Sequence, residues 1–365
     1  MSGTRTISPT ARYWIGFQRT KRIGPVRLAR LTDHFGSIES AWNAPVADLR
    51  LVLDEHSVDS LTAVRRAYDP DAEIERIERL DIAVTTLDQP DYPRLLAEIP
   101  NPPAVLYYKG TLDEGDINAV GMVGTRRCTP YGRQIAHGMA SELAAAGVTV
   151  VSGLALGIDG QAHRGALDGG GRTLAILGSG VDIIYPSSHR ELAEKVMARG
   201  AVISDYPPGT KPDARNFPPR NRIIAGLSRG VVVVESPIRS GALITVDFAA
   251  DYGRDVYCVP GNALSEASAG CHRVIRDGGR LVATATDLLE DLGITAPESG
   301  QAVQQAFPMT DAERHLFNYI RWEPQYIDEI AASAGLPAHE CGAMLTMLEL
   351  KGAVRDTGGL HFVRV

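Results

Sequence analysis

The stretch Ala119-Val-Gly-Met-Val-Gly-Thr-Arg-Arg127 begins the pattern that decides the fold. Its first five residues are typical of a buried strand, and the segments over 131–146 and 148–151 read as a helix and a second apolar strand. Apolar strands separated by helices of roughly 10–15 residues indicate parallel βαβ units with right-handed crossovers. The sequence therefore predicts an α/β fold: a doubly wound, Rossmann-like, mostly parallel sheet.

The alternation covers a central domain over residues 86–292, whose first predicted strand is a short one over 105–108. The segments predicted after the first βαβ unit are strands over 172–177, 201–204, 231–234 and 256–259, and helices that begin near Gln161 and span 190–199, 221–227 and 242–252. In such sheets, ligands bind in the crevice at the carboxyl ends of the strands.

Five loops that contain glycine follow the core strands and are expected to lie at this crevice. They are Gly124–Arg127, Ser152–Gly153, Gly178–Gly180, Tyr206–Gly209 and Glu235–Gly241. Glycines allow close backbone approach, and free amides at helix starts attract anions. We expect the loops to form an anion-binding cradle, with Ser240 as N-cap of the helix that runs through Thr245.

A basic segment, residues 211–230, follows the fourth core strand of this domain. It holds Lys211, Arg215, Arg220, Arg222 and Arg229 against one acid, and Phe217 lies among them. A cationic loop with an embedded aromatic ring suits a phosphate backbone and an unstacked base. The structural alternative is a solvated loop that leads into a helix.

Two common phosphate-binding signatures are missing from the cradle. There is no Gly-x-Gly-x-x-Gly between a strand and a helix, and Gly178-Ser-Gly180 is not followed by Gly-Lys-Ser/Thr. A dinucleotide cofactor or ATP is thus unsupported, and no cofactor or metal is expected. The ligands that remain are the backbone phosphates of a longer polymer. Four arginines could bind them, Arg126, Arg127, Arg220 and Arg222.

Two groups of side chains carry an enzymatic alternative. Asp159 and His163 share a helix face near Ser152, so His163 could serve as a general base oriented by Asp159. The structural interpretation, in which Asp159 caps the helix and His163 anchors its first turns, is preferred because no nucleophile-elbow spacing accompanies the pair. Glu235 is a carboxylate close to the start of a helix, and it could take part in a reaction at a sugar. Acidic residues near helix N-termini are, however, commonly structural, because they interact favourably with the helix dipole.

Composition describes an ordinary globular protein of 365 residues, with 44% hydrophobic and 22% charged residues and a net charge of −7. Nucleic-acid binding would therefore need a local basic patch. No apolar run is long enough to span a bilayer, and residues 1–10 lack a signal-peptide core. Four scattered cysteines without Cys-x-x-Cys argue against disulfides and thiolate metal sites, so we expect a cytoplasmic protein without membrane contact.

Smaller domains flank the centre. Residues 1–85 predict short helices, including one that ends at Gly36. A turn at Ile23-Gly24 resembles a helix-hairpin-helix, but a small helical domain that packs for its own sake or docks a partner is preferred. Residues 293–307 read as a linker. Over 308–365, three helices and a hairpin predict a winged helix. That domain has five basic and eight acidic residues, so protein contact or self-packing is preferred over duplex binding.

The motifs of the central domain resemble those of the DprA/Smf family of DNA-processing proteins. They occur in the same order as in that family, from about residue 87 to 289. The resemblance rests on Val123-Gly-Thr-Arg126, the run from Val151 to His163, Tyr185-Pro186, the run from Phe217 to Gly226, the run from Ser240 to Thr245, and Val259-Pro-Gly261. The flanking pieces match a layout of that family, with a sterile-alpha-motif-like domain in front and a winged helix behind.

The resemblance implies a binding protein rather than an enzyme, one that binds and protects single-stranded DNA during natural transformation and loads the RecA recombinase. It also implies a homodimer through the central domain, a phosphate on Arg126, a base against Phe217 and phosphate near Arg222. Two departures are the family lysine before Phe217, for which Arg215 or Lys211 would substitute, and His272 where Asn is common. The predicted DNA-binding set is Gly124, Thr125, Arg126, Arg127, Ser152, Gly153, Lys211, Arg215, Phe217, Arg220, Asn221, Arg222, Ser240, Gly241 and Thr245.

Two other hypotheses stay open. One is an enzyme similar to the lysine-decarboxylase-like phosphoribohydrolases, although this chain has Ser-Gly-Ala-Leu-Ile-Thr245 where those carry Pro-Gly-Gly-x-Gly-Thr-x-x-Glu. The other is an adaptor whose outer domains chiefly recruit proteins.

Overall fold

A computed structural model describes residues 7–294, 309–322 and 324–364. The chain divides into two compact units, residues 1–297 and 298–365, and each is treated by itself below. The linker predicted over 293–307 falls mostly outside the described residues.

The first unit begins with helices that pack around an aromatic core. Phe17 and Trp42 meet edge-on with ring centroids 5.2 Å apart, and Leu28 and Leu31 are buried on α2. Gly36 ends α2 in the left-handed conformation, at φ 77°. The helices are α1 (Ala11–Gln18), α2 (Pro25–Phe35), α3 (Ile38–Asn43), α4 (Val46–Leu49), α5 (Glu55–Ala67) and α6 (Pro70–Arg79).

A nine-stranded sheet follows, in the order β1-β2-β6-β5-β4-β3-β7-β8-β9. Pairing is parallel from β6 to β9, whereas β1, β2 and β6 pair antiparallel. The division predicted between residues 85 and 86 falls inside β1. The strands are β1 (Ala83–Thr86), β2 (Val105–Gly110), β3 (Ala119–Val123), β4 (Thr149–Ser152), β5 (Thr173–Ile176), β6 (Ala201–Ser204), β7 (Gly230–Val233), β8 (Asp255–Cys258) and β9 (Arg280–Leu281).

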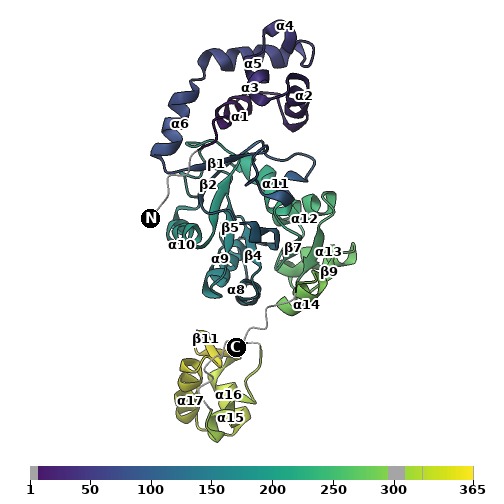
Figure 1. Cartoon of the computed structure of the whole chain (residues 1–365). Helices are drawn as coiled ribbons and strands as arrows, with labels where there is room; N and C mark the ends of the chain where they lie inside the picture. The colour runs from purple at the N-terminus through teal and green to yellow at the C-terminus, as the bar shows by residue number, and fades with distance from the viewer. Residues whose placement is uncertain (1–6, 295–308, 323, 365) are drawn as a thin grey trace. The chain divides into compact units, whose positions relative to one another are not determined.

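Helices cover both faces of this sheet, so the predicted doubly wound α/β fold is confirmed. Met122 and Val150 pack with α8 and α9 on one face, whereas Val151 and Val233 pack with α11 and α12 on the other (Figure 1). Successive strand residues point to opposite faces, which is why neighbours such as 150 and 151 divide in this way. The helices are α7 (Arg94–Ala97), α8 (Pro130–Ala145), α9 (Ile158–Asp168), α10 (Arg190–Arg199), α11 (Phe217–Gly226), α12 (Ala242–Asp251), α13 (Ala269–Arg276) and α14 (Ala285–Asp291).

One helix boundary differs from the prediction in a way that matters for the site. The segment over 221–227 was expected to be the helix, with Phe217 in the preceding loop. Instead α11 starts at Phe217, and Pro218 and Pro219 occupy its first turn. Proline suits these positions because its fixed φ is helical and the missing amide has no helical partner there. Phe217 and Arg220 are therefore held on a helix.

The second unit is a small winged helix with its own core, in which Leu316, Leu345 and Phe362 are buried. A capping box lies at its start: Thr310 Oγ1 accepts from the Glu313 amide at 3.2 Å, and Glu313 Oε2 accepts from the Thr310 amide at 2.6 Å. Its elements are α15 (Asp311–Phe317), β10 (Gln325–Tyr326), α16 (Ile327–Ala334), α17 (Ala338–Leu350), β11 (Val354–Gly358) and β12 (His361–Arg364).

Candidate nucleic-acid interface

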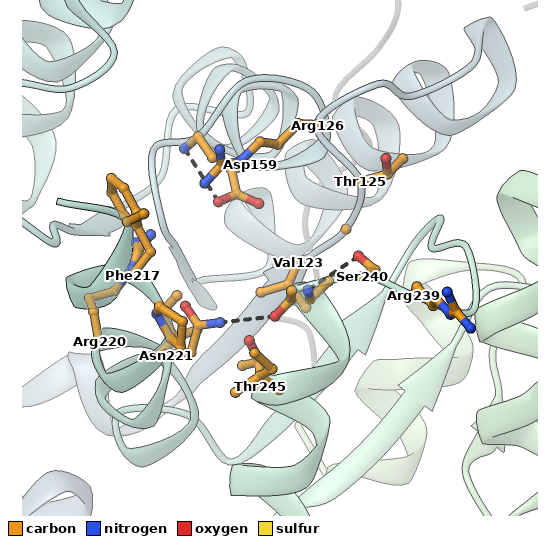
Figure 2. Close-up of a pocket in the computed structure, with 18 of the residues that line it drawn as sticks. Val123, Thr125, Arg126, Asp159, Phe217, Arg220, Asn221, Arg239, Ser240 and Thr245 are labelled. Carbon is orange, nitrogen blue, oxygen red and sulfur yellow. Dashed lines mark hydrogen bonds between the residues drawn. The ribbon is translucent and has the colours of Figure 1, made fainter. Parts of the chain in front are cut away.

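A pocket of about 590 Å³ opens at the carboxyl edge of the sheet. It lies where β3 and β7 are neighbours and the strand order changes direction, the position at which doubly wound sheets bind ligands. Figure 2 shows Phe217, Arg220 and Asn221 on one side of it, and Ser240 and Arg239 across from them. Its wall comes from the turn after β3, α9, α11, the loop after β7 and the first turns of α12.

The turn after β3 is held tightly against its neighbours. A Cβ at Gly124 would lie 2.5 Å from Ile158 Cγ1 and 2.8 Å from Glu235 O, so only glycine fits there. The Thr125 amide donates to Glu235 O at 2.7 Å. The glycine predicted to let a ligand approach is thus also needed for packing, and this packing fixes the position of Arg126.

Two exposed guanidinium groups stand at the pocket, Arg126 from the β3 turn and Arg239 from the β7 loop. Over the described ranges of the chain, neither has an ion pair or a hydrogen bond, and Arg126 contacts only the ring of Phe217, 5.4 Å from its centroid. Unpaired arginines keep all their donors for an anionic ligand.

Arg220 supplies a third cation from inside the wall. Its side chain is buried, at 4% exposure, and one Nη1 hydrogen bond goes to Ile176 O. Burial lowers the pKa of Arg220 to about 10, which leaves it protonated at neutral pH. Its Nε finds no partner among the described residues. A buried cation with an unsatisfied donor favours an incoming anion.

Asp159 is the carboxylate of the pocket wall, and its Oδ2 already accepts two hydrogen bonds. Asp159 Oδ2 accepts from the Gly153 amide at 3.2 Å and from the Ala155 amide at 3.3 Å. Burial raises the pKa of Asp159, an effect that Arg220 opposes. The Gly153 amide, predicted to face phosphate, is therefore occupied by Asp159.

An aromatic pair flanks the arginines. The Phe217 and Tyr185 ring centroids are 5.6 Å apart, and Tyr185 is 44% exposed. Gly178 makes room for Phe217, because a Cβ there would lie 2.8 Å from Phe217 Cδ1. Phe217 is thus packed from behind while Tyr185 presents its ring to solvent.

The start of α12 forms the far wall. Gly241, and not Ser240, is the N-cap residue; the Ala242 amide donates to Ser240 Oγ at 3.3 Å. The helix begins at residue 242 as predicted, and Ser240 lies one residue before its N-cap. Asn221 Nδ2 donates across the pocket to Gly241 O at 3.1 Å, which joins α11 to α12 (Figure 2).

The structure brings nine of the fifteen predicted residues to this pocket and places six elsewhere. Arg222, expected near phosphate, instead pairs with Asp205 at 2.6 Å. Ser152 is fully buried and donates to Met122 O at 2.6 Å, and Arg215 pairs with Asp213 at 2.8 Å. Arg127 and Lys211 are exposed outside the wall. The nine lining residues are Gly124, Thr125, Arg126, Phe217, Arg220, Asn221, Ser240, Gly241 and Thr245.

The groups weighed for catalysis have structural roles here. His163 Nδ1 lies 2.7 Å from Thr173 Oγ1, and burial lowers the pKa of His163 to about 3. Glu235 binds Thr129 at the start of α8, accepting from its amide at 2.8 Å and its hydroxyl at 2.7 Å. Asp159 and His163 therefore have different partners, and the predicted cap is not formed, because the N-cap of α9 is Gly157 and no side chain caps it.

Among the pocket residues outside the predicted set, Tyr185 supplies an exposed ring and Arg239 an unpaired cation. Both come from loops at the carboxyl ends of core strands, so the same positional rule selects them. In the described ranges, no group of three His, Cys, Asp or Glu side chains is placed to hold a metal ion. None of the described helices has the length and apolar character needed to cross a membrane.

Comparison with known proteins identifies the family to which this fold belongs. The model of the family "DNA recombination-mediator protein A" matches residues 83–293, and the DprA winged helix domain matches residues 300–359. This chain belongs to the DprA/Smf family. It is 37% identical to Protein Smf of Synechocystis sp., over 96% of this chain and 98% of that one. It is 36% identical to the putative DNA processing protein DprA of Mycobacterium tuberculosis, over 97% and 94%.

Solved structures of DprA proteins have a similar fold. The X-ray structure of DprA from Streptococcus pneumoniae matches with a TM-score of 0.69 and 33% identity, covering 77% of this chain and 97% of that one. DprA from Helicobacter pylori, whose structure is described as giving a unique single-stranded DNA binding mode, matches with a TM-score of 0.51 and 27% identity. It covers 57% of this chain and 95% of that one.

Proposed function

We propose that the protein binds single-stranded DNA across the pocket between α11 and α12. The observation that carries this proposal is the convergence of Arg126, Arg220 and Arg239 on one pocket, where the carboxylate Asp159 is already hydrogen-bonded. The chain as a whole is acidic, so this local positive charge marks a specific anion site.

The aromatic pair favours a single strand over a duplex. Bases in a duplex are stacked on one another and cannot reach Tyr185 or Phe217, whereas an unpaired strand exposes its base faces. The phosphates of such a strand would lie on Arg126 and Arg239. The printed description of the Helicobacter pylori relative, which names a single-stranded DNA binding mode, supports the same ligand.

Family membership extends the proposal to the cellular role. The bound strand is DNA taken up during natural transformation, which the protein protects and on which it loads the RecA recombinase, acting as a cytoplasmic homodimer joined through the central domain. Because the winged helix has an acidic balance, its contacts are with protein rather than with duplex DNA. No catalytic step is assigned to the pocket.

Fluorescence anisotropy tests the binding. Labelled single- and double-stranded oligonucleotides of equal length are titrated with the full chain at several salt concentrations, with mononucleotides as competitors. We expect tighter binding of the single strand, a steep loss of affinity with salt and weak competition by mononucleotides. Equal affinity for the duplex would overturn the proposal, and release of free base from the competitor would revive the phosphoribohydrolase alternative.

The partner and dimer proposals need separate measurements. Light scattering of the purified protein should give twice the monomer mass. RecA filament assembly on single strands coated with single-strand-binding protein should accelerate when the protein is added. A monomeric mass or an unchanged assembly rate would remove the corresponding part of the proposal without affecting the DNA site.

A further inference from the structure

Another pocket, of about 660 Å³, lies at the amino edge of the sheet. Its wall includes Leu174 near the start of β5, and its residue Asp116 pairs with Arg172, which directly precedes that strand. The pocket proposed for DNA opens at the opposite, carboxyl edge, and the two pockets share no lining residue. The amino-edge pocket is therefore a separate surface of the first unit, and the proposed DNA site does not use it.

A short 3-10 helix, η1 (Glu114–Ile117), forms one side of the amino-edge pocket. Hydrogen bonds fix its first turn: Asp113 Oδ1 accepts from the Gly115 amide at 2.8 Å, and Asp116 Oδ2 accepts from the Asp113 amide at 3.0 Å. Asp116 Oδ1 also accepts from Arg172 Nε at 3.0 Å, which ties η1 to the residue before β5. The exposed side chains of η1 are thus held in place before any partner binds, which lowers the entropic cost of binding.

Aliphatic and proline side chains form the apolar part of this pocket. Leu95 and Leu112 are half-buried, and Ile117 is 39% exposed. Exposed aliphatic groups around a hollow are typical of surfaces that contact another protein, because a partner side chain removes them from water. Pro90 and Pro93 have no amide hydrogen, so these two residues supply backbone acceptors but no backbone donor.

The charged groups of the pocket are mostly acidic. Four carboxylates line it against one guanidinium group, that of Arg94. Asp116 is already paired with Arg172, at 2.9 Å. Carboxylates accept hydrogen bonds and donate none, so the unpaired ones attract a cationic donor and repel phosphate. Within the residues that the structure describes, the lining carboxylates without an ion pair are Asp91, Asp113 and Glu114.

We propose that the amino-edge pocket docks a basic segment of a protein partner, in which a Lys or Arg lies beside a Leu or Ile. The aliphatic side chain of that segment packs on Leu95, Leu112 and Ile117, and its cation lies against Asp91 and Glu114. The inference goes beyond the proposed DNA site. Because the two pockets are at opposite edges of the sheet, a partner held here leaves the DNA pocket open, so strand and partner are bound together.

Peptide selection tests this surface. A displayed library of random peptides of about a dozen residues is selected on the immobilised full chain, and the enriched peptides are then synthesised and titrated by fluorescence anisotropy. We expect peptides that combine Lys or Arg with Leu or Ile. Glu114→Lys should weaken their binding by about 10-fold or more, because it replaces attraction by repulsion. Glu194→Lys reverses an exposed charge on α10, outside the pocket, and should bind them as the wild type does.

A second variant tests the apolar contact without changing charge. Ile117→Ser should also weaken peptide binding, because it removes an exposed aliphatic group, while its affinity for a labelled single strand stays equal to that of the wild type. Thermal unfolding checks that the variants fold. Failure to enrich basic peptides, or equal affinity of the wild type and Glu114→Lys for them, overturns the docking surface.

Two further results separate this surface from other contacts. A molar mass that differs between the wild type and Glu114→Lys in light scattering would assign the pocket to contact between copies of the chain, and would overturn the protein partner. A chain that binds the basic peptides through Glu114 but binds no single strand would overturn the proposed DNA site and leave the docking surface standing.

Discussion

Arg222 Nη2 lies 2.6 Å from Asp205 Oδ2, and these side chains are only 15% and 16% exposed. Arg222 Nη1 also donates to Asn101 O at 2.8 Å. The pair thus ties α11 to the end of β6 and to the segment before β2. Of the two arginines in Phe217-Pro-Pro-Arg-Asn-Arg222, Arg220 faces the pocket and Arg222 holds the helix that carries it.

Replacing Arg222 should therefore reduce stability more than DNA affinity. Arg222→Ala leaves Asp205 buried without its counter-charge, and breaking such a pair typically costs about 3–5 kcal/mol. Urea unfolding of the central unit measures the loss. Arg215→Ala is the matched control, because its pair with Asp213 is exposed and screened by solvent and should contribute little to stability. Equal unfolding midpoints for the two variants would contradict the scaffold role.

Arg126 should carry a phosphate contact. Arg126→Ala is expected to weaken single-strand binding by about 10-fold or more, because a charge-assisted hydrogen bond is lost. The slope of log affinity against log salt should fall by about 0.7, the value for one phosphate on a single strand. Arg127→Ala removes an exposed charge from the next residue, outside the pocket wall, and should change both quantities much less. Identical salt slopes for wild type and Arg126→Ala would argue against the contact.

Phe217 should contribute through its aromatic face. Phe217→Leu keeps an apolar side chain against Gly178 but removes the ring, and loss of one stacked base costs about 1–3 kcal/mol of binding. Phe217→Tyr keeps the ring and should bind nearly as the wild type does. Anisotropy titration at a fixed salt concentration distinguishes them, and thermal unfolding checks that both variants fold. If the Phe217→Leu and Phe217→Tyr variants bind the strand with equal affinity, base stacking on this ring does not contribute to binding.

His163 should make stability depend on pH. Its pKa is about 3 in the folded protein and 6.5 when unperturbed, so the unfolded state binds the proton more readily. The stabilising contribution of neutral His163 is complete above pH 6.5 and is lost as pH falls from 6.5 toward 3, by at most about 1.4 kcal/mol per pH unit. Urea unfolding at several pH values measures this slope. His163→Asn should be less stable at neutral pH and show a shallower decline; an unchanged slope would contradict the assignment.

The winged helix should be dispensable for strand binding. Each compact unit has its own buried core, and every pocket residue belongs to the first unit. A chain of residues 1–297 should therefore bind single strands within about 2-fold of the full chain, because it keeps every residue that lines the pocket. The same titration checks it, and a much larger loss would assign DNA contact to the second unit.

The sheet and the position of the site were predictable because both follow from short-range patterns. Apolar runs such as 119–123 alternate with helical segments, and the crevice rule then selects the loops after β3 and β7. Capping residues such as Thr310 indicate the start of a helix within a few residues of sequence. None of this requires knowledge of which side chains meet in space.

The partners of individual charged residues were harder to predict. Arg220 and Arg222 are two residues apart in a helix, so they point in different directions, and only the packing of α11 decides which one meets Asp205. Ser152 looked available in a loop but ends a buried strand. The helix was predicted to begin at Asn221, although Pro218 and Pro219 occupy the first turn of α11. Long-range contacts settle each of these cases.

The bonds from the N-terminal helices to the loop before α11 have a genetic consequence. Gln18 Nε2 donates to Asp205 O at 2.6 Å, and Arg76 Nη2 donates to Pro208 O at 2.9 Å. Both acceptors are main-chain carbonyls, which every amino acid possesses, so the loop sequence can drift in evolution while these attachments persist. The donors have no such freedom. A screen for variants defective in strand binding should therefore recover substitutions at Gln18 and Arg76, far along the chain from the pocket.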